Sequence, residues 1–240
     1  MACVWASHDG EVRVLPDACV DVVFSDGRLV VAGPATAPDL ARATPGRPRV
    51  GVRFRIGAAG GALGLGVGEL RDRGVALSEV WGRAAARAME DRVAKAMERG
   101  RGEALLALVG GIAPRLPRPE DADHEVRRAV VALARPSATA PDVAALAAGV
   151  GLSERQLRRR FEAAVGYGPA TLARVLRFQR FLRAADARDR DAGTPLARLA
   201  ADAGYADQAH LAREVRRLAG LPPSALLAAG AAPAGERLRA

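Results

Sequence analysis

The sequence has few of the residues that disulfide scaffolds and metal centres require. Its two cysteines, Cys3 and Cys19, are too few for a disulfide framework or a four-cysteine zinc site. Its three histidines, His8, His124 and His210, lie far apart in the chain. No apolar run approaches the roughly 18 residues that a membrane span needs, and the first residues lack the basic and apolar regions of a signal peptide. We therefore expect a cytoplasmic protein without a metal or other cofactor.

Aromatic residues and lysine are also scarce. Aromatics are 4% of the chain and Lys95 is the single lysine, whereas half of all residues are hydrophobic. Leucine, valine and alanine must therefore build the core, and abundant alanine favours helices. The 35 arginines give a net charge of +9. Such arginine usage is typical of GC-rich genomes, but it is also what a nucleic-acid-binding surface requires. The positions of the arginines must decide between the two explanations.

Residues 10–56 have the composition of short strands. Valines recur there in short apolar runs, and Asp26-Gly27 is a two-residue hairpin signal between two such runs. Residues 50–56 alternate in hydropathy, which predicts a strand with one buried face. Helical spacing of apolar residues then predicts one helix from Ser78 to about Arg99 and another near 103–113.

Two segments of the second half repeat one another. Residues 143–151 and 196–204 each read as a short amphipathic helix closed by glycine, and each precedes an N-cap residue, Ser153 or Asp207. Ser153 also begins a capping box with Gln156. A second amphipathic helix follows each cap and ends at a glycine 13 residues beyond it. The pattern predicts two helix-turn-helix units, whose second helices, about 154–165 and 208–219, can enter the DNA major groove.

Each of these second helices has an apolar face and a basic face. The apolar residues at core spacing are Leu157, Phe161, Val165, Leu211, Val215 and Leu218. Arginine pairs with guanine and glutamine with adenine, and the outward faces carry both types, at Arg155, Arg158, Arg159, Gln208, Arg213 and Arg216. The expected DNA-binding set is completed by Arg160 and Arg217, which suit phosphate contacts, and by Gln156 and His210.

A long helix is expected between the two units. Pro169 suits the first turn of a helix, and apolar spacing continues to about Ala185. Roughly 17 residues in a helix span about 25 Å. A rod of that order could hold two reading helices on one face of a duplex, in successive major-groove turns about 34 Å apart.

The predicted fold is α+β in two domains. A small β-rich N-terminal domain with helices, for which a cupin-like barrel is one candidate form, precedes an all-α domain with two helix-turn-helix units joined by a long helix. Prolines 114, 117 and 119 indicate a stiff linker between them. The expected units are an effector-sensing or dimerisation domain at 1–114, the linker at 115–122, the DNA-binding domain at 123–228 and a tail at 229–240.

The second half resembles the DNA-binding domain of AraC/XylS-type transcription regulators over about residues 123–228. The segments that carry the similarity are Leu146-Ala147, Val150–Phe161, Gly166–Pro169, Arg177-Phe178, Gly204–Glu214 and Gly220–Pro223. The resemblance implies seven helices and activation or repression of promoters. It also implies base contacts from the outer faces of the two second helices, here at Arg155, Arg158, Arg159, Gln208 and Arg213. The chain departs from the family pattern at Val215, where an aromatic residue is usual, and at Gly149 inside the first repeat.

Residues 15–23, 31–34 and 51–55 resemble the N-terminal domain of a subset of these regulators in high-GC bacteria. This resemblance implies that the N-terminal domain senses an effector or forms a dimer. The expected partners are double-stranded DNA, RNA polymerase in the case of an activator, a small-molecule effector and a second copy of the chain, with no membrane. The expected location is the cytoplasm, at the nucleoid.

Three other interpretations stay open from the sequence. A metal-dependent cupin-type enzyme would need clustered histidines, which the three separated ones do not provide. Cys19 could act as a redox sensor, but it lies in an apparent apolar strand beside Asp17 and Asp21, whose charges raise the pKa of a thiol, so a small buried residue is the better interpretation. The N-terminal domain could also serve for dimerisation alone.

Overall fold

The computed structural model describes residues 3–7, 12–41, 47–118, 123–137, 139–188 and 195–229. His8 and most of the expected tail lie outside these residues. In the described part of the chain, no helix is both long and apolar enough to cross a membrane.

The N-terminal domain is built on an antiparallel sheet. Its strands are β1 (Cys3–Ser7), β3 (Asp21–Ser25), β4 (Arg28–Ala32), β6 (Arg49–Arg53) and β7 (Gly74–Ala76), in the order β1-β6-β3-β4-β7. A separate two-stranded ribbon consists of β2 (Val12–Val14) and β5 (Asp39–Ala41). The prediction of a β-rich domain is confirmed, but the described strands form an open sheet and a ribbon in place of a closed cupin-like barrel.

The hairpin expected at Asp26-Gly27 joins β3 to β4. Both residues have positive φ angles, 51° and 78°, as a type I′ turn requires. The prediction for residues 50–56 is partly wrong, because β6 ends at Arg53 and its residues 49–52 are all buried. The strand lies between β1 and β3, and the Trp5 ring lies directly over Gly51, where a Cβ would approach it to 2.4 Å.

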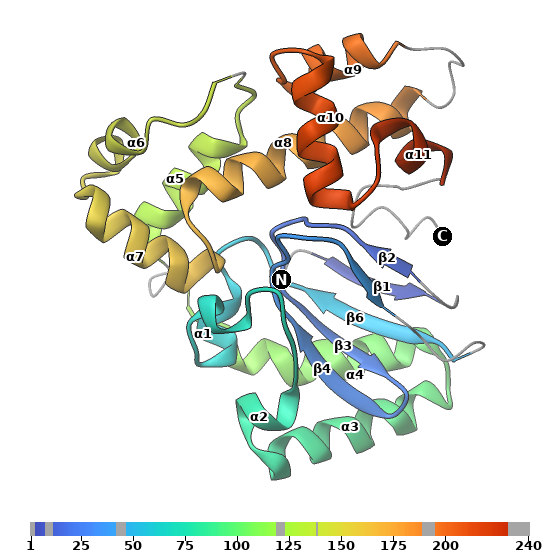
Figure 1. Cartoon of the computed structure of the whole chain (residues 1–240). Helices are drawn as coiled ribbons and strands as arrows, with labels where there is room; N and C mark the ends of the chain where they lie inside the picture. Colours follow the sequence, from blue (N-terminus) through green and yellow to red (C-terminus); the bar gives the residue numbers. More distant parts are fainter. Residues whose placement is uncertain are drawn as a thin grey trace.

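Short and long helices follow the strands of the sheet domain and pack on its sheet. They are α1 (Ala59–Leu63), the short 3-10 helix η1 (Val67–Leu70), α2 (Leu77–Trp81), α3 (Arg83–Met97), α4 (Arg101–Ile112) and the 3-10 turn η2 (Ala113–Arg115). The single helix predicted from Ser78 is divided at Gly82, whose φ is 82°. Helices α3 and α4 pack together and cross one face of the sheet (Figure 1).

The second half is helical throughout its described residues, as predicted. Its helices are α5 (His124–Ala134), α6 (Val143–Val150), α7 (Glu154–Val165), α8 (Pro169–Arg188), α9 (Leu196–Ala203), α10 (Gln208–Ala219) and α11 (Pro223–Ala228). Figure 1 shows α8 as the long central helix, with α6 and α7 near one end and α9 and α10 near the other.

Two hydrophobic cores hold the molecule together. One lies between the sheet and α1–α4, and the other lies among α5–α11. Leu15 and Ala18 precede β3 in sequence, yet both belong to the helical core. The N-terminal domain therefore contributes side chains to the interior of the helical domain. At the expected linker, Leu116 packs on the core of the sheet domain, whereas residues 119–122 lie outside the described residues.

Candidate nucleic-acid interface

The first helix-turn-helix unit consists of α6 and α7. Helix α6 ends at Gly151 in the left-handed conformation, with φ at 80°, which glycine adopts without strain. Ser153 then caps α7: its hydroxyl accepts a hydrogen bond from the Gln156 amide at 3.3 Å, while Gln156 Oε1 accepts one from the Ser153 amide at 2.9 Å. The predicted capping box is confirmed, and it supplies hydrogen-bond partners to two backbone amides at the start of α7.

The second unit, α9 and α10, has the same local geometry. Helix α9 ends at Gly204, also left-handed with φ at 86°, and the Asp207 carboxylate accepts a hydrogen bond from the His210 amide at the start of α10. The Tyr205 amide bonds back to the Ala200 carbonyl at 2.8 Å, as the Leu152 amide bonds to the Ala147 carbonyl at 3.0 Å in the first unit. The repeat seen in the sequence is therefore a repeat in the structure.

Each second helix buries the predicted face. The six apolar residues at core spacing are at most 3% exposed and lie in the helical core: Leu157, Phe161, Val165, Leu211, Val215 and Leu218. Val215, where the family pattern has an aromatic, is fully buried. Because the apolar faces point inward, the basic faces of α7 and α10 must point outward.

The basic face of α7 is open over its first half. Arg155, Arg158 and Arg159 are all exposed. Arg158 pairs with Glu154 one turn earlier, at 3.2 Å, but its side chain is 62% exposed. An exposed pair of this kind stabilises a helix by only about 0.3–0.5 kcal/mol, so it leaves Arg158 able to turn toward a phosphate or base.

Three other residues of the expected DNA-binding set have partners within the protein. Gln156 belongs to the capping box. Arg160 lies 3.2 Å from Glu125 and 3.5 Å from Asp123, at the start of α5. His210 Nδ1 accepts a hydrogen bond from the Ala206 amide at 3.4 Å. These side chains stabilise the two units, so their expected role toward DNA is weaker than that of the exposed arginines.

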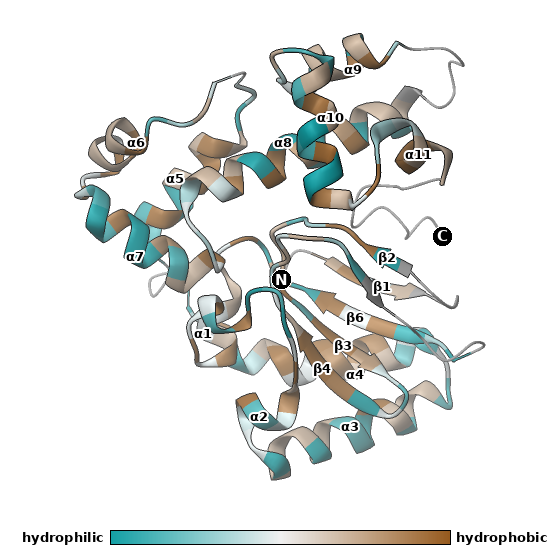
Figure 2. Ribbon diagram, in the orientation of Figure 1, coloured by the Kyte–Doolittle hydropathy of each residue, from teal (hydrophilic) through white to brown (hydrophobic). Residues whose placement is uncertain are grey.

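Helix α10 also has an outward basic face. Gln208, Arg213, Arg216 and Arg217 are exposed, and Figure 2 shows hydrophilic colour along the outer sides of α7 and α10. The expected long helix between the units is confirmed as α8, which has 20 residues. A helix of that length spans roughly 30 Å, which approaches the separation of successive major-groove turns, about 34 Å.

The N-terminal domain contacts the C-terminal end of each reading helix. At the end of α7, a Cβ on Gly166 would lie 2.5 Å from Pro34 Cγ and 3.3 Å from the Val67 carbonyl oxygen. At the end of α10, the Arg13 guanidinium donates a hydrogen bond to the Ala219 carbonyl at 3.1 Å. The contacts at these ends leave the N-terminal turns of both reading helices exposed.

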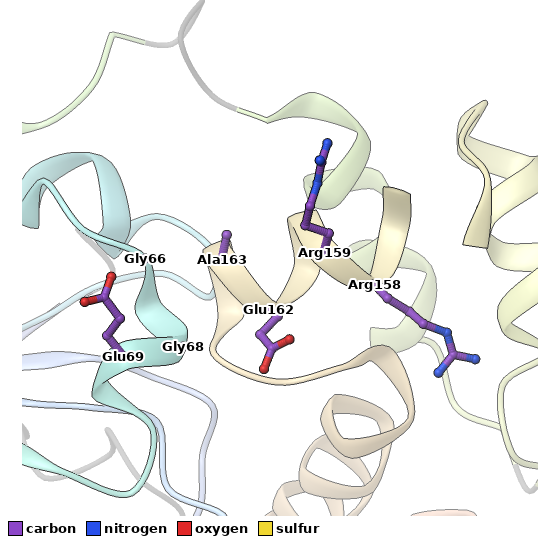
Figure 3. A pocket seen from close by; sticks show the side chains of 7 residues that line it. All are labelled: Gly66, Gly68, Glu69, Arg158, Arg159, Glu162 and Ala163. Carbon is purple, nitrogen blue, oxygen red and sulfur yellow. The ribbon is translucent and has the colours of Figure 1, made fainter. Parts of the chain in front are cut away.

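An open hollow of about 540 Å³ lies where η1 meets α7. It is lined by Gly66, Gly68, Glu69, Arg158, Arg159, Glu162 and Ala163. Figure 3 shows Arg158 and Arg159 extending away from η1, whereas Glu162 lies nearer to it. Glu162 also forms an ion pair with Arg71 at 3.6 Å. The second half of α7 is therefore held against the N-terminal domain, and its first half is left open.

A loop of the N-terminal domain, residues 15–20, docks on the central helix α8. Gln179 of α8, only 4% exposed, donates a hydrogen bond from Nε2 to the Pro16 carbonyl at 2.7 Å. Within the loop, Asp17 lies 3.0 Å from Arg53, and Arg53 also binds both carboxylate oxygens of Asp21. This charged cluster anchors the loop to the sheet while its apolar residues enter the helical domain.

The structure corrects the placement of Cys19. The residue lies in this docking loop before β3 and not in a strand, and it is partly exposed. Burial of the thiol raises the pKa of Cys19 strongly, and the nearby Asp17 carboxylate raises it further. Because the thiolate is the reactive form, this environment does not favour a redox-sensing thiol. Among the described residues, no three potential metal ligands gather in one place.

Sequence reasoning missed the contacts that join the two units. Arg177 and Arg180 of α8 donate hydrogen bonds to backbone carbonyls of the α5–α6 loop and of α9, although a charged residue on a helix is ordinarily expected to face solvent. The signal available in the sequence was the recurrence of arginine at every third position of this helix, at 174, 177, 180 and 183. It also missed the docking loop, because nothing local to residues 15–18 indicates partners more than a hundred residues away.

The chain is similar to known proteins in both halves. Residues 146–229 match the model of a family described as "Helix-turn-helix domain", and residues 1–76 match "Domain of unknown function (DUF6597)". Among solved structures, ToxT from Vibrio cholerae matches with 9% identity and a TM-score of 0.42, over 94% of this chain and 96% of that one. No curated protein matches the chain.

The family match and the geometry agree on the second half of the molecule. The match covers the whole of α7 and α10. Both units have a left-handed glycine after the first helix, a side-chain cap on the second and a buried apolar face, and the turn of the second unit is one residue longer. The chain thus carries an AraC-type helix-turn-helix DNA-binding domain at residues 146–229, preceded by an N-terminal antiparallel β-sheet domain whose family has no assigned function.

Proposed function

We propose that this protein is a sequence-specific transcription regulator that reads two successive major-groove segments of one duplex with α7 and α10. The observation that carries the proposal is the pair of equivalent units at the two ends of α8, each with an exposed basic face at its reading helix. Arg155, Arg158 and Arg159 are the base-reading residues on α7, and Gln208 and Arg213 are those on α10. Arg216 and Arg217 contact phosphates.

The N-terminal domain has a regulatory role in this proposal. Its contacts with Gly166 and Ala219 reach the C-terminal ends of both reading helices, and its loop 15–20 enters the helical core. A change in the sheet domain would therefore reach both DNA-reading helices through direct contacts. We keep the predicted domain limits, 1–114 and 123–228. The predicted partners are a small-molecule effector, RNA polymerase and a second copy of the chain. The raised thiol pKa of Cys19 argues against the redox alternative.

Alanine substitutions at the two reading helices test the proposal. We expect Arg158→Ala and Arg213→Ala each to weaken binding to a duplex selected by the full chain by about 1–3 kcal/mol, the value of one bidentate base contact. Fluorescence anisotropy at fixed salt measures this change. The matched control is Arg87→Ala on α3, which is exposed and outside the helical domain. Equal affinities for all four proteins would show that these arginines do not read bases.

A further inference from the structure

A buried arginine of α8 lies between the loop that leads into the first helix-turn-helix unit and the turn of the second unit. Arg177 is only 6% exposed, and its Nη2 atom donates hydrogen bonds to the Thr139 carbonyl at 3.1 Å and the Ser137 carbonyl at 3.4 Å. Both carbonyls belong to the loop between α5 and α6, which leads into the first unit. The same guanidinium lies over the Tyr205 ring, with Cζ 5.6 Å from its centroid. Tyr205 lies in the turn of the second unit, so Arg177 contacts both that turn and the segment that leads into the first unit.

The backbone of the α5–α6 loop also contacts the backbone of the second unit at this place. A Cβ added to Gly204, in the turn of the second unit, would lie 2.9 Å from the Ser137 carbonyl oxygen. The Ser137 carbonyl therefore accepts a hydrogen bond from Arg177 and also lies against the turn that sets the direction of α10. A displacement of one unit relative to the other must break this arrangement.

Two neighbouring arginines on the same face of α8 hold the second unit alone. Arg180 donates a hydrogen bond to the Ala203 carbonyl at the end of α9, at 3.2 Å, and Arg174 pairs with Glu214 of α10 at 3.6 Å. Residues three apart along a helix share a face, so these arginines form one row with Arg177. Among the described residues, Arg177 is the one of these three arginines that bonds to the loop leading into the first unit.

We propose that Arg177 is a positioning residue that fixes the orientation of α10 relative to α7, and thereby the spacing between the two half-sites that the protein accepts. This inference rests on the proposed function. One inserted base pair moves the second half-site by about 3.4 Å and rotates it by roughly 34°, because a turn of DNA has 10–10.5 base pairs. Two units that are locked together cannot follow that rotation, whereas two loosely joined units can.

The test is selection of DNA from a library of random duplexes by the full chain and its variants. The wild type should recover two half-motifs at one spacing, and a one-base-pair insertion should weaken its binding about tenfold or more, the loss of one bidentate base contact. Arg177→Met keeps an unbranched aliphatic stem and removes the guanidinium, and with it both hydrogen bonds and the cation–ring contact. It should recover the same half-motifs at several spacings, and an insertion should change its affinity less than about threefold, since mobile units each keep their own base contacts.

Changes at Tyr205 provide a second variant and its matched control. Tyr205→Leu removes the ring beneath the guanidinium and should also relax the spacing. Tyr205→Phe keeps the ring and removes a hydroxyl that has no hydrogen-bond partner among the described residues, so it should keep the wild-type spacing. Arg183→Ala, an exposed position on α8, should keep it as well.

Several results would overturn the inference. One is a single unchanged spacing in both Arg177→Met and Tyr205→Leu. Another is an equal loss of binding by these variants at every spacing and at isolated half-sites, which would indicate a purely structural role. A wild type that recovers only one half-motif would instead contradict the proposed function itself, so the two failures can be told apart.

Discussion

Replacing Arg53 with methionine should lower the free energy of unfolding by about 3–5 kcal/mol, because the change leaves buried carboxylates without their cation. The Arg53, Asp17 and Asp21 side chains are only 12–13% exposed. Arg53 binds Asp21 through Nε and Nη2, at 2.9 Å and 2.7 Å, and approaches Asp17 at 3.0 Å. Chemical denaturation of the full chain measures the loss, and Arg55→Met, at an exposed position in the same segment, is the matched control.

The pH dependence identifies the cause of this loss. Burial raises the pKa of Asp17, and it outweighs the nearby Arg53 charge, which lowers it. The contact between them is an ion pair in which Asp17 Oδ2 lacks a hydrogen-bond partner among the described residues. An acid whose pKa is higher in the folded than in the unfolded state holds its proton longer when folded, so its contribution to stability falls as pH rises from about 4 through the folded pKa.

The loss in Arg53→Met should therefore shrink as the pH is lowered toward the ordinary pKa of aspartate, because protonated Asp17 no longer carries a buried charge. Adding Asp17→Asn and Asp21→Asn to the variant should restore stability to within about 2 kcal/mol of the parent, since no uncompensated charge remains. A loss that is independent of pH and unaffected by the two asparagines would show that the cluster does not act through charge.

The second large effect is expected at Phe161. Its side chain is fully buried in the helical core. Phe161→Ala should lower the free energy of unfolding by about 3–5 kcal/mol, as large-to-small changes of buried aromatics do. Because Phe161 faces the core directly behind the exposed arginines of α7, loss of its packing should also loosen the reading helix and weaken DNA binding.

Arg159→Ala is the matched control for stability. It lies on the same helix but on the exposed face, so it should change the free energy of unfolding by no more than about 0.5 kcal/mol. Denaturant unfolding monitored by circular dichroism separates the two cases. A Phe161→Ala protein within 1 kcal/mol of the wild type would contradict the packing described, since the transfer of a buried aromatic alone accounts for roughly 1.5–3 kcal/mol.

The elements predicted well from the sequence are those specified by local rules. Gly151, Ser153 and Gln156 define the turn and cap of the first unit within six residues, and Gly204 and Asp207 do the same in the second. The buried face of α7 could be predicted because Leu157 and Phe161 lie one helical turn apart. Asp26-Gly27 likewise specified its hairpin, because a type I′ turn needs positive φ angles at its two central residues and these two residues adopt them.

The features that sequence reasoning did not predict depend on partners distant in the chain. The apolar neighbours of Cys19 predict a strand. The residue lies instead in a loop that Arg53 and Gln179 fix in place through contacts with Asp17 and Pro16. Strand β6 was expected to have one solvent-facing side, but residues 49–52 are all buried, because α4 packs against the strand and the Trp5 ring covers Gly51. Arg177 is buried because the α5–α6 loop and Tyr205 enclose it. None of these arrangements follows from spacing or propensity near the residue concerned.

Base-resolved interference footprinting of a selected duplex tests most directly whether α7 and α10 read one DNA molecule together. Binding of the wild type should depend on two clusters of bases on one face of the duplex, whose centres are about one helical turn apart. Arg158→Ala should lose the requirement at one cluster and Arg213→Ala at the other. A single cluster with the wild type, or loss of the same cluster in both variants, would contradict reading by two helices.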